Sequence, residues 1–96
     1  MAFKRYGART DKNQSVIVKH INRLPNCRVI DLSGVAGGCP DILIQQSFPD
    51  RVRFHLVEIK TDKGKLNKKQ VKFHAEHHCH IAKTVEDVWS ILGLDL

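Results

Sequence analysis

Three ionisable residues near the middle of the chain have the types and the spacing of a hydrolytic site. Asp41 follows Pro40, and Glu58 and Lys60 lie farther along the chain on either side of Ile59. Alternate side chains of an extended strand share a face, so Glu58 and Lys60 are predicted to point the same way. A turn midway between Asp41 and Glu58 would bring the two carboxylates opposite each other.

Two neighbouring carboxylates repel each other unless a cation joins them, and Mg²⁺ accepts such oxygen ligands while keeping several of its waters. A nearby lysine can orient or deprotonate a metal-bound water and offset the charge of a phosphate. This combination predicts a metal-dependent site that hydrolyses phosphodiesters. An ordinary surface ion pair is the alternative. The apolar segment around Glu58 favours the catalytic interpretation, because a charged face is unusual there unless it binds something.

A second group of possible metal ligands follows towards the C-terminus. It consists of His74, His77, His78, Cys79 and His80. Two imidazoles on one helical face and a thiolate could form a zinc site. The chain has no Cys-x-x-Cys pair, which favours the simpler interpretation that cationic side chains gather at a helix end. His74, one turn after Gln70, is the best candidate in this group for a site role, and a packing role is equally open.

Hydrophobic periodicity predicts the first helix and the strands that position these residues. The buried face of a helix from about residue 11 to 24 is marked by Val16, Ile17, Ile21 and Leu24. Alternating and β-branched segments predict strands at 27–32, 40–45, 52–60 and 80–83, with a glycine-rich loop at 33–38 and a turn at 47–50.

Two further helices are predicted around the last strand. Asn67 and Gln70 have the spacing of a capping box, which starts a helix that continues to about residue 77. Residues 85–92 have the apolar spacing of a short final helix. The resulting order of elements predicts an α/β fold with one sheet between helices.

The chain has 96 residues and a formal net charge of +6. This length allows a single domain, assigned to residues 11–96 behind a basic arm at 1–10. No apolar stretch has the length of a membrane span or of a signal-peptide core, and the three cysteines are irregularly spaced. We therefore expect a cytoplasmic protein with reduced thiols.

The basic residues are concentrated in two segments, residues 1–28 and residues 60–72. This concentration of positive charge favours nucleic acid as the partner. The predicted contacts to DNA phosphates are Lys63, Lys65, Lys68, Lys69 and Lys72, with Arg5 and Arg9 in the arm. A solvated helix face and a disordered tail are the alternatives for these two segments. No pattern of a recognition helix is present, so we expect little sequence specificity.

Five short blocks of the sequence occur in a characteristic order. They are Asp11-Lys12-Asn13-Gln14, Gly37-Gly38-Cys39-Pro40-Asp41, Val57-Glu58-Ile59-Lys60, Leu66-Asn67-Lys68-Lys69-Gln70 and Thr84-Val85-Glu86-Asp87. This series resembles the VRR-NUC (virus-type replication-repair nuclease) domain of the PD-(D/E)xK nuclease superfamily, in particular its small stand-alone phage and bacterial members. The resemblance covers residues 9–92. It implies a restriction-endonuclease-like αβββαβ core, in which helices flank a mixed sheet.

The resemblance also implies an activity, namely Mg²⁺- or Mn²⁺-dependent cleavage of structured or branched DNA by a homodimer, as in Holliday-junction resolvases. By motif match, Asp41 and Glu58 would bind the metal together with the backbone carbonyl of Ile59. Lys60 would be the catalytic lysine, and Gln70 would support this group or contact a phosphate.

The first helix departs from the pattern of the superfamily. Many members carry a glutamate there, whereas this chain has Gln14, which could bind a metal through its carbonyl or through a water. The departure leaves open whether one or two metal ions bind. It also favours an alternative function, a non-catalytic DNA-binding module of the same fold. A sequence-specific restriction-type nuclease is the third possibility.

Overall fold

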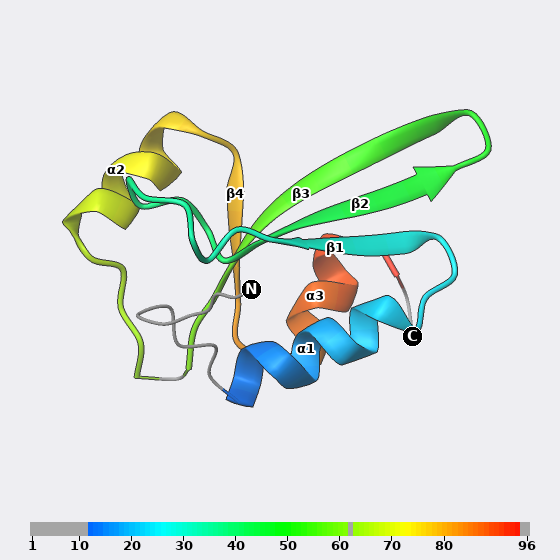
Figure 1. Ribbon diagram of the computed structural model, residues 1–96, viewed down its shortest axis with the longest axis horizontal. Coiled ribbons are helices and arrows are strands. Elements are labelled where there is room, and N and C mark those ends of the chain that lie inside the picture. Colours follow the sequence, from blue (N-terminus) through cyan, green and yellow to red (C-terminus); the bar gives the residue numbers. More distant parts are fainter. Residues whose placement is uncertain (1–11, 62, 95–96) are drawn as a thin grey trace.

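The computed structural model describes residues 12–61 and 63–94 (Figure 1). Over these residues the chain forms three helices and four strands in the predicted order. The predicted basic arm at 1–10 lies outside the described residues. Within the described part, no helix combines the length and the apolarity needed to cross a membrane.

The four described strands form one mixed sheet in the order β1-β2-β3-β4. Their bounds are Cys27–Asp31 for β1, Ile42–Phe48 for β2, Arg51–Ile59 for β3 and Cys79–Ala82 for β4. The first three strands are antiparallel, and β4 pairs in parallel with β3. The α/β fold class is therefore confirmed. Strand β2 continues through Phe48, so the hairpin turn is shorter than the predicted 47–50 and holds only Pro49 and Asp50.

Two helices, α1 (Lys12–Asn22) and α3 (Val85–Ile91), cover one face of the sheet (Figure 1). The core between them and the sheet contains Ile17, Ile21, Ile42, Ile44, Val57, Ile59, Val88 and Leu92. One prediction for α1 is wrong, because Val16 is 49% exposed. The buried stripe of α1 runs through Gln14, Ile17 and Ile21 instead, and this spacing turns Val16 towards solvent.

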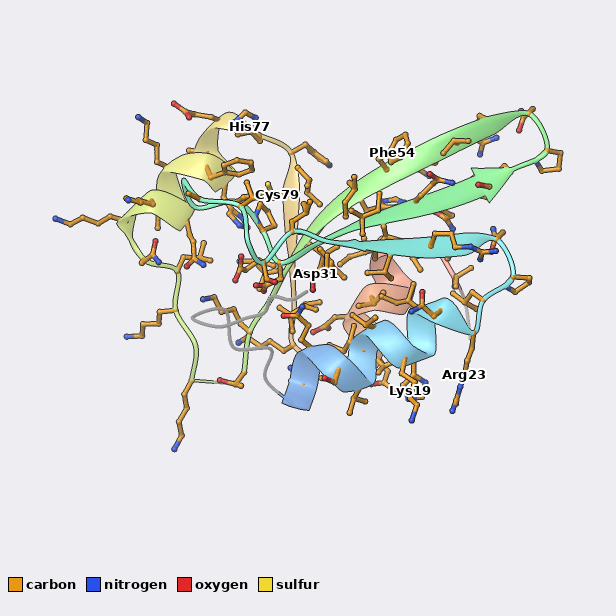
Figure 2. All side chains as sticks on the ribbon, viewed as in Figure 1. Lys19, Arg23, Asp31, Phe54, His77 and Cys79 are labelled. Atoms are coloured by element: carbon orange, nitrogen blue, oxygen red, sulfur yellow. The ribbon has the colours of Figure 1, made fainter. Side chains whose placement is uncertain are left out.

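The opposite face of the sheet carries apolar side chains that α1 and α3 do not cover. We call it the open face, and the strand registers place on it Ile30, Leu43, Val52, Phe54, Leu56 and Ile81. Phe54 is 58% exposed and projects away from both helices (Figure 2). Helix α2 (Lys68–Glu76) lies beside the end of the sheet where β4 starts and contains no buried residue.

Candidate active site

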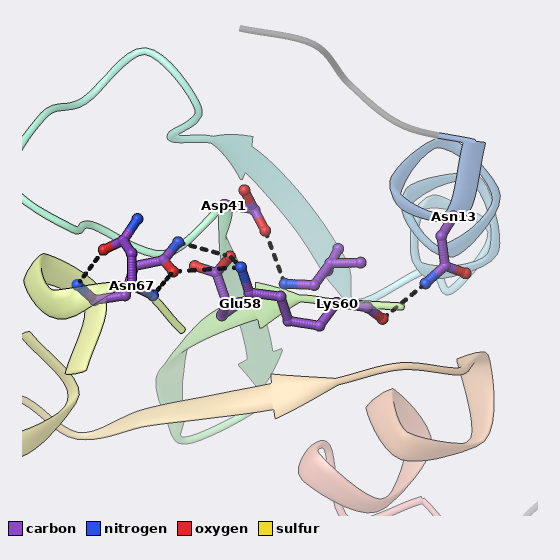
Figure 3. A network of polar contacts seen from close by, with 7 residues as sticks. Asn13, Asp41, Glu58, Lys60 and Asn67 are labelled. Carbon is purple, nitrogen blue, oxygen red and sulfur yellow. Dashed lines mark hydrogen bonds and ion pairs between the residues drawn. The ribbon is translucent and has the colours of Figure 1, made fainter. Parts of the chain in front are cut away.

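The strand register places Asp41 and Glu58 opposite each other, as predicted. The β2–β3 pairing ends at Ile42 with Val57, and continuing it by one residue sets Asp41 across from Glu58, whose pKa the Asp41 carboxylate raises. Strand β2 begins only after Asp41, and the carboxylate Oδ2 of Asp41 accepts a hydrogen bond from the Ile59 amide at 2.8 Å (Figure 3). The Asp41 side chain thus continues the hydrogen bonding between β2 and β3 one residue before β2 begins.

Glu58, Lys60 and Gln70 form a closed triangle of polar contacts, and Figure 3 labels Glu58 and Lys60 within it. Lys60 Nζ lies 3.6 Å from Glu58 Oε2, and Gln70 Nε2 donates to the same oxygen at 3.2 Å. Lys60 Nζ also donates to Gln70 Oε1 at 3.3 Å. The side chain of Glu58 is only 3% exposed and that of Lys60 19%. Glu58 and Lys60 therefore share a face, as strand alternation predicts, and Gln70 joins them from another element.

The start of α2 holds Gln70 in place. Asn67 Oδ1 accepts from the Gln70 amide, and Gln70 Oε1 accepts from the Asn67 amide, both at 2.9 Å. This is the predicted capping box. Gly38, with a φ of +81°, packs directly against the same turn of α2, and a Cβ there would overlap the Lys69 carbonyl. The glycine-rich loop therefore sets how closely α2 approaches the carboxylates.

Asn13 is a site-supporting residue to which the sequence reasoning assigned no such role. Its Nδ2 donates to the carbonyls of Lys60, at 3.2 Å, and Lys83, at 3.0 Å. The Lys60 amide in turn donates to the Ala82 carbonyl at 3.0 Å. The backbone of Lys60 is therefore fixed between α1 and β4. The available signal was the position of Asn13 within the first of the five sequence blocks.

The surroundings of Glu58 oppose its negative charge. Burial and the nearby Asp41 carboxylate raise the pKa of Glu58 from its ordinary value of 4.5 to about 7, although Lys60 acts in the opposite direction. Glu58 Oε1 is buried and has no hydrogen-bond partner among the described residues. An unpaired buried oxygen is costly, so this atom requires a proton or a cation.

The oxygen donors around this atom fit a hard divalent cation. They line a pocket of about 350 Å³ formed by Gln14, Asp41, Glu58, Ile59, Lys60, Thr61, Gly64 and Gln70. The N–H and C=O of one strand residue point to the same side, so the Ile59 carbonyl faces Asp41 as its amide does. Within residues 12–61 and 63–94, no three His, Cys, Asp or Glu side chains come together to hold a metal. Two carboxylates with waters and substrate phosphate are nevertheless a normal Mg²⁺ environment.

In the histidine-rich segment, too, no three such side chains of the described residues come together, so the structure does not support a zinc site there. Burial and the nearby carboxylate of Glu58 also raise the pKa of Cys79, which disfavours the thiolate that zinc requires. His74 Nε2 is buried without a hydrogen-bond partner among the described residues. Burial and the charge of Lys60 lower the pKa of His74, and His74 is not among the residues that line the pocket.

The lysines predicted to contact DNA flank the pocket on the loop after β3 and on α2. Lys63, Lys65, Lys68, Lys69 and Lys72 are all exposed. Lys60 differs from them because it is half-buried and paired with Glu58. Arg5 and Arg9, the predicted contacts of the arm, lie outside the described residues.

Comparisons with known proteins identify no relative of this chain. No protein-family model, no curated protein and no solved structure matches the chain.

Proposed function

We propose that this protein is a metal-dependent endonuclease that hydrolyses phosphodiester bonds in structured or branched DNA. The observation that carries the proposal is the buried Glu58 oxygen, which has no partner among the described residues and lies in a pocket with Asp41 and Lys60. The order of the elements and the mixed sheet support a restriction-endonuclease-like core. The exposed lysines beside the pocket supply positive charge where a DNA backbone would lie.

In this mechanism Asp41, Glu58 and the Ile59 carbonyl would hold Mg²⁺ or Mn²⁺, with Gln14 at the pocket wall as a further oxygen donor. When bound, the ion supplies positive charge at the phosphate and acidifies water. Lys60, released from its ion pair with Glu58, donates hydrogen bonds to a phosphate oxygen. Water attacks phosphorus and releases a proton to solvent, the bond from phosphorus to the leaving oxygen breaks, and that oxygen takes up a proton from solvent.

Gln70 acts as a positioning residue in this proposal. Its amide contacts both Glu58 Oε2 and Lys60 Nζ, and its own position depends on the Asn67 cap. Without the Gln70 amide, the side chains of Glu58 and Lys60 would be held less firmly in the pocket. Accurate placement of such groups contributes strongly to hydrolytic rates.

We also propose that the protein acts as a homodimer through the open face. Ile30, Val52, Phe54 and Ile81 are each at least 44% exposed and share this face. Contiguous exposed apolar side chains of this kind mark interaction surfaces. A second copy would place a second site in the same particle, which suits a substrate with two strands to cut.

The test is cleavage of a labelled four-way DNA junction with Mg²⁺ or Mn²⁺. We expect Asp41→Asn and Lys60→Ala to lower the rate by about 100-fold or more, because each removes a group from the reacting centre. Asp50→Asn, in the exposed hairpin turn, and Lys83→Ala, exposed after β4, are the matched controls and should cleave at the wild-type rate. Cleavage by Asp41→Asn and Lys60→Ala at the wild-type rate would contradict the assignment.

One observation favours a second candidate function, a DNA-binding module without catalysis. The buried position on α1 that faces the pocket is an amide, Gln14, rather than a carboxylate. This alternative predicts salt-sensitive DNA binding without cleavage at any divalent-ion concentration. A restriction-type nuclease would instead give a defined fragment pattern on linear plasmid DNA.

A further inference from the structure

A second cavity lies directly beside the catalytic pocket, between α1 and β1. This α1–β1 groove has a volume of about 510 Å³ and is lined by Gln14, Ser15, Val18, Lys19, Asn22, Val29, Asp31 and Ile42. Gln14 belongs to the walls of both cavities. A ligand in the groove and a ligand in the catalytic pocket would therefore be separated only by the Gln14 side chain.

The lining of the groove suits a neutral planar ring better than a phosphate. The partly exposed Val18 and Val29 supply aliphatic surface, with the buried Ile42 behind them, and Ser15 and Asn22 supply donors and acceptors. The carboxylate of Asp31 is oriented by a hydrogen bond from the Ser33 amide at 2.8 Å and would repel a phosphate. Figure 2 shows Asp31 at the end of β1, over α1. An aspartate instead accepts from the amino group of a base.

We propose that the α1–β1 groove binds an unpaired nucleobase of the DNA strand whose phosphodiester lies in the catalytic pocket. This proposal rests on the proposed nuclease function and narrows its substrate class. A phosphate and the neighbouring base are joined through one sugar, which matches two cavities that share a wall. Bases inside a duplex are stacked and paired, and an enzyme must unstack them or use a strand that is already open. The preferred substrate is therefore DNA with unpaired nucleotides at the cleavage point, such as a flap, a bulge or a gap.

In this proposal the groove contributes more to positioning the DNA strand than to the affinity for DNA. Its lining contains no aromatic side chain, so the base packs on aliphatic groups and forms hydrogen bonds at the rim. Lys19 provides positive charge at the groove for the neighbouring phosphate. Binding therefore depends on salt, whereas selection of the unpaired base depends on the shape of the groove.

The experiment compares two phenylalanine substitutions one residue apart on α1. Ser15→Phe fills the groove from an exposed position, and Val16→Phe adds the same ring to an exposed side chain that does not line the groove. The probe is a DNA duplex with one bulged 2-aminopurine, and its fluorescence is followed in EDTA so that no cleavage occurs. A fully paired duplex with the same label is the second substrate. Thermal unfolding of both variants verifies that each is folded.

We expect wild-type protein and Val16→Phe to change the emission of the bulged 2-aminopurine and Ser15→Phe to leave it unchanged. In Mg²⁺ or Mn²⁺, Ser15→Phe should lower cleavage of the bulged substrate by about tenfold and leave cleavage of the paired duplex unaltered. Equal behaviour of folded Ser15→Phe and Val16→Phe would overturn the proposal, as would equal cleavage of bulged and paired DNA by the wild type. Cleavage that depends on Asp41, without a change in 2-aminopurine fluorescence, would contradict the groove proposal and leave the nuclease proposal standing. The fluorescence change without any cleavage would support the groove and remove the nuclease.

Discussion

The carboxyl group of Glu58 is held where its ionised form is not fully satisfied. The ionised form lies beside Asp41 in a buried pocket, and it keeps Oε1 without a partner among the described residues. The ion pair with Lys60 at 3.6 Å offsets this cost only in part, because the pKa of Glu58 is still raised to about 7. Carboxyl groups whose pKa is raised by burial and by a neighbouring carboxylate are frequent at catalytic centres.

Replacement of Glu58 should change how stability depends on pH. The unfolded chain releases the Glu58 proton near pH 4.5, and the folded chain keeps it until about pH 7. The folded form therefore binds the extra proton in this window, and wild-type stability falls as pH rises through it. Glu58→Gln removes that fall, so its stability relative to the wild type should rise by up to about 3 kcal/mol between pH 4 and pH 8 in EDTA.

Urea denaturation across this pH range measures the effect. Glu76→Gln, at an exposed position on α2, is the matched control and should follow the wild type. Added Mg²⁺ should stabilise the wild type at pH 8 and have no effect on Glu58→Gln. Parallel stability curves for the wild type and Glu58→Gln would show that the Glu58 proton is not retained by the folded chain.

Helix α2 brings Gln70 to the site without belonging to the core. None of its residues is buried, and its position depends on the Asn67 cap and on contact with the glycine-rich loop. Gly37 and Gly38 both have positive φ, at 85° and 81°. A Cβ at Gly37 would meet no atom within 4 Å, whereas one at Gly38 would lie 2.8 Å from the Gln70 amide nitrogen. A substitution at Gly37 therefore tests backbone strain alone, whereas one at Gly38 tests the same strain together with the close approach of α2.

Gly38→Ala should impair cleavage more than Gly37→Ala does. Both substitutions force alanine into a left-handed conformation, at a cost of about 1–2 kcal/mol each. Only Gly38→Ala also displaces the first turn of α2 and with it Gln70. Melting temperatures should fall for both variants and further for Gly38→Ala, and the cleavage rate should fall by about tenfold more for Gly38→Ala. Equal rates for the two variants would show that the approach of α2 does not control the site.

Sequence patterns predicted the elements because the signals for them are local. Strand alternation and a central turn are sufficient to place Asp41 opposite Glu58, and the spacing of Asn67 and Gln70 predicts the cap. Val16 was misplaced because several phases of a helix fit the same short apolar pattern, and tertiary packing selects one of them. The contacts of Asn13 could not be predicted, because they join a side chain to backbone carbonyls 47 and 70 residues away. The α1–β1 groove likewise depends on how α1 and β1 pack.

At the scale of the whole molecule, the two faces of the sheet have different surroundings. One face is covered by α1 and α3, and the open face exposes Ile30, Val52, Phe54 and Ile81. The net charge of +6 opposes association of two copies over long distances, so salt should favour the dimer. Under the proposals above, a second copy would pack on the apolar part of the open face and DNA would lie along the lysines beside the pocket, near the point where Glu58 joins the same face opposite Ile81.

Phe54→Asp should weaken self-association. The substitution places a charge at the most exposed large apolar residue of the open face, where a partner would bury it. Sedimentation equilibrium should show a dimer for the wild type and a dissociation constant at least about tenfold higher for Phe54→Asp. Val35→Asp is the matched control, because Val35 is 54% exposed and lies outside the open face. A monomeric wild type, or equal association of the two variants, would contradict the assignment of this surface.

The bridge from Asn13 to the Lys60 and Lys83 carbonyls has a consequence for the order of events during synthesis. Asn13 and Lys83, which are joined by one of these hydrogen bonds, are 70 residues apart in the sequence. Strand β4 pairs in parallel with β3 and is synthesised after both α1 and the β2–β3 hairpin. The end of β3 that carries Lys60 cannot reach its final position until residue 83 has left the ribosome. A nascent chain can thus form the β2–β3 hairpin that carries Glu58 and still lack a fixed Lys60. If the protein is the nuclease proposed above, cleavage would have to wait until β4 is in place.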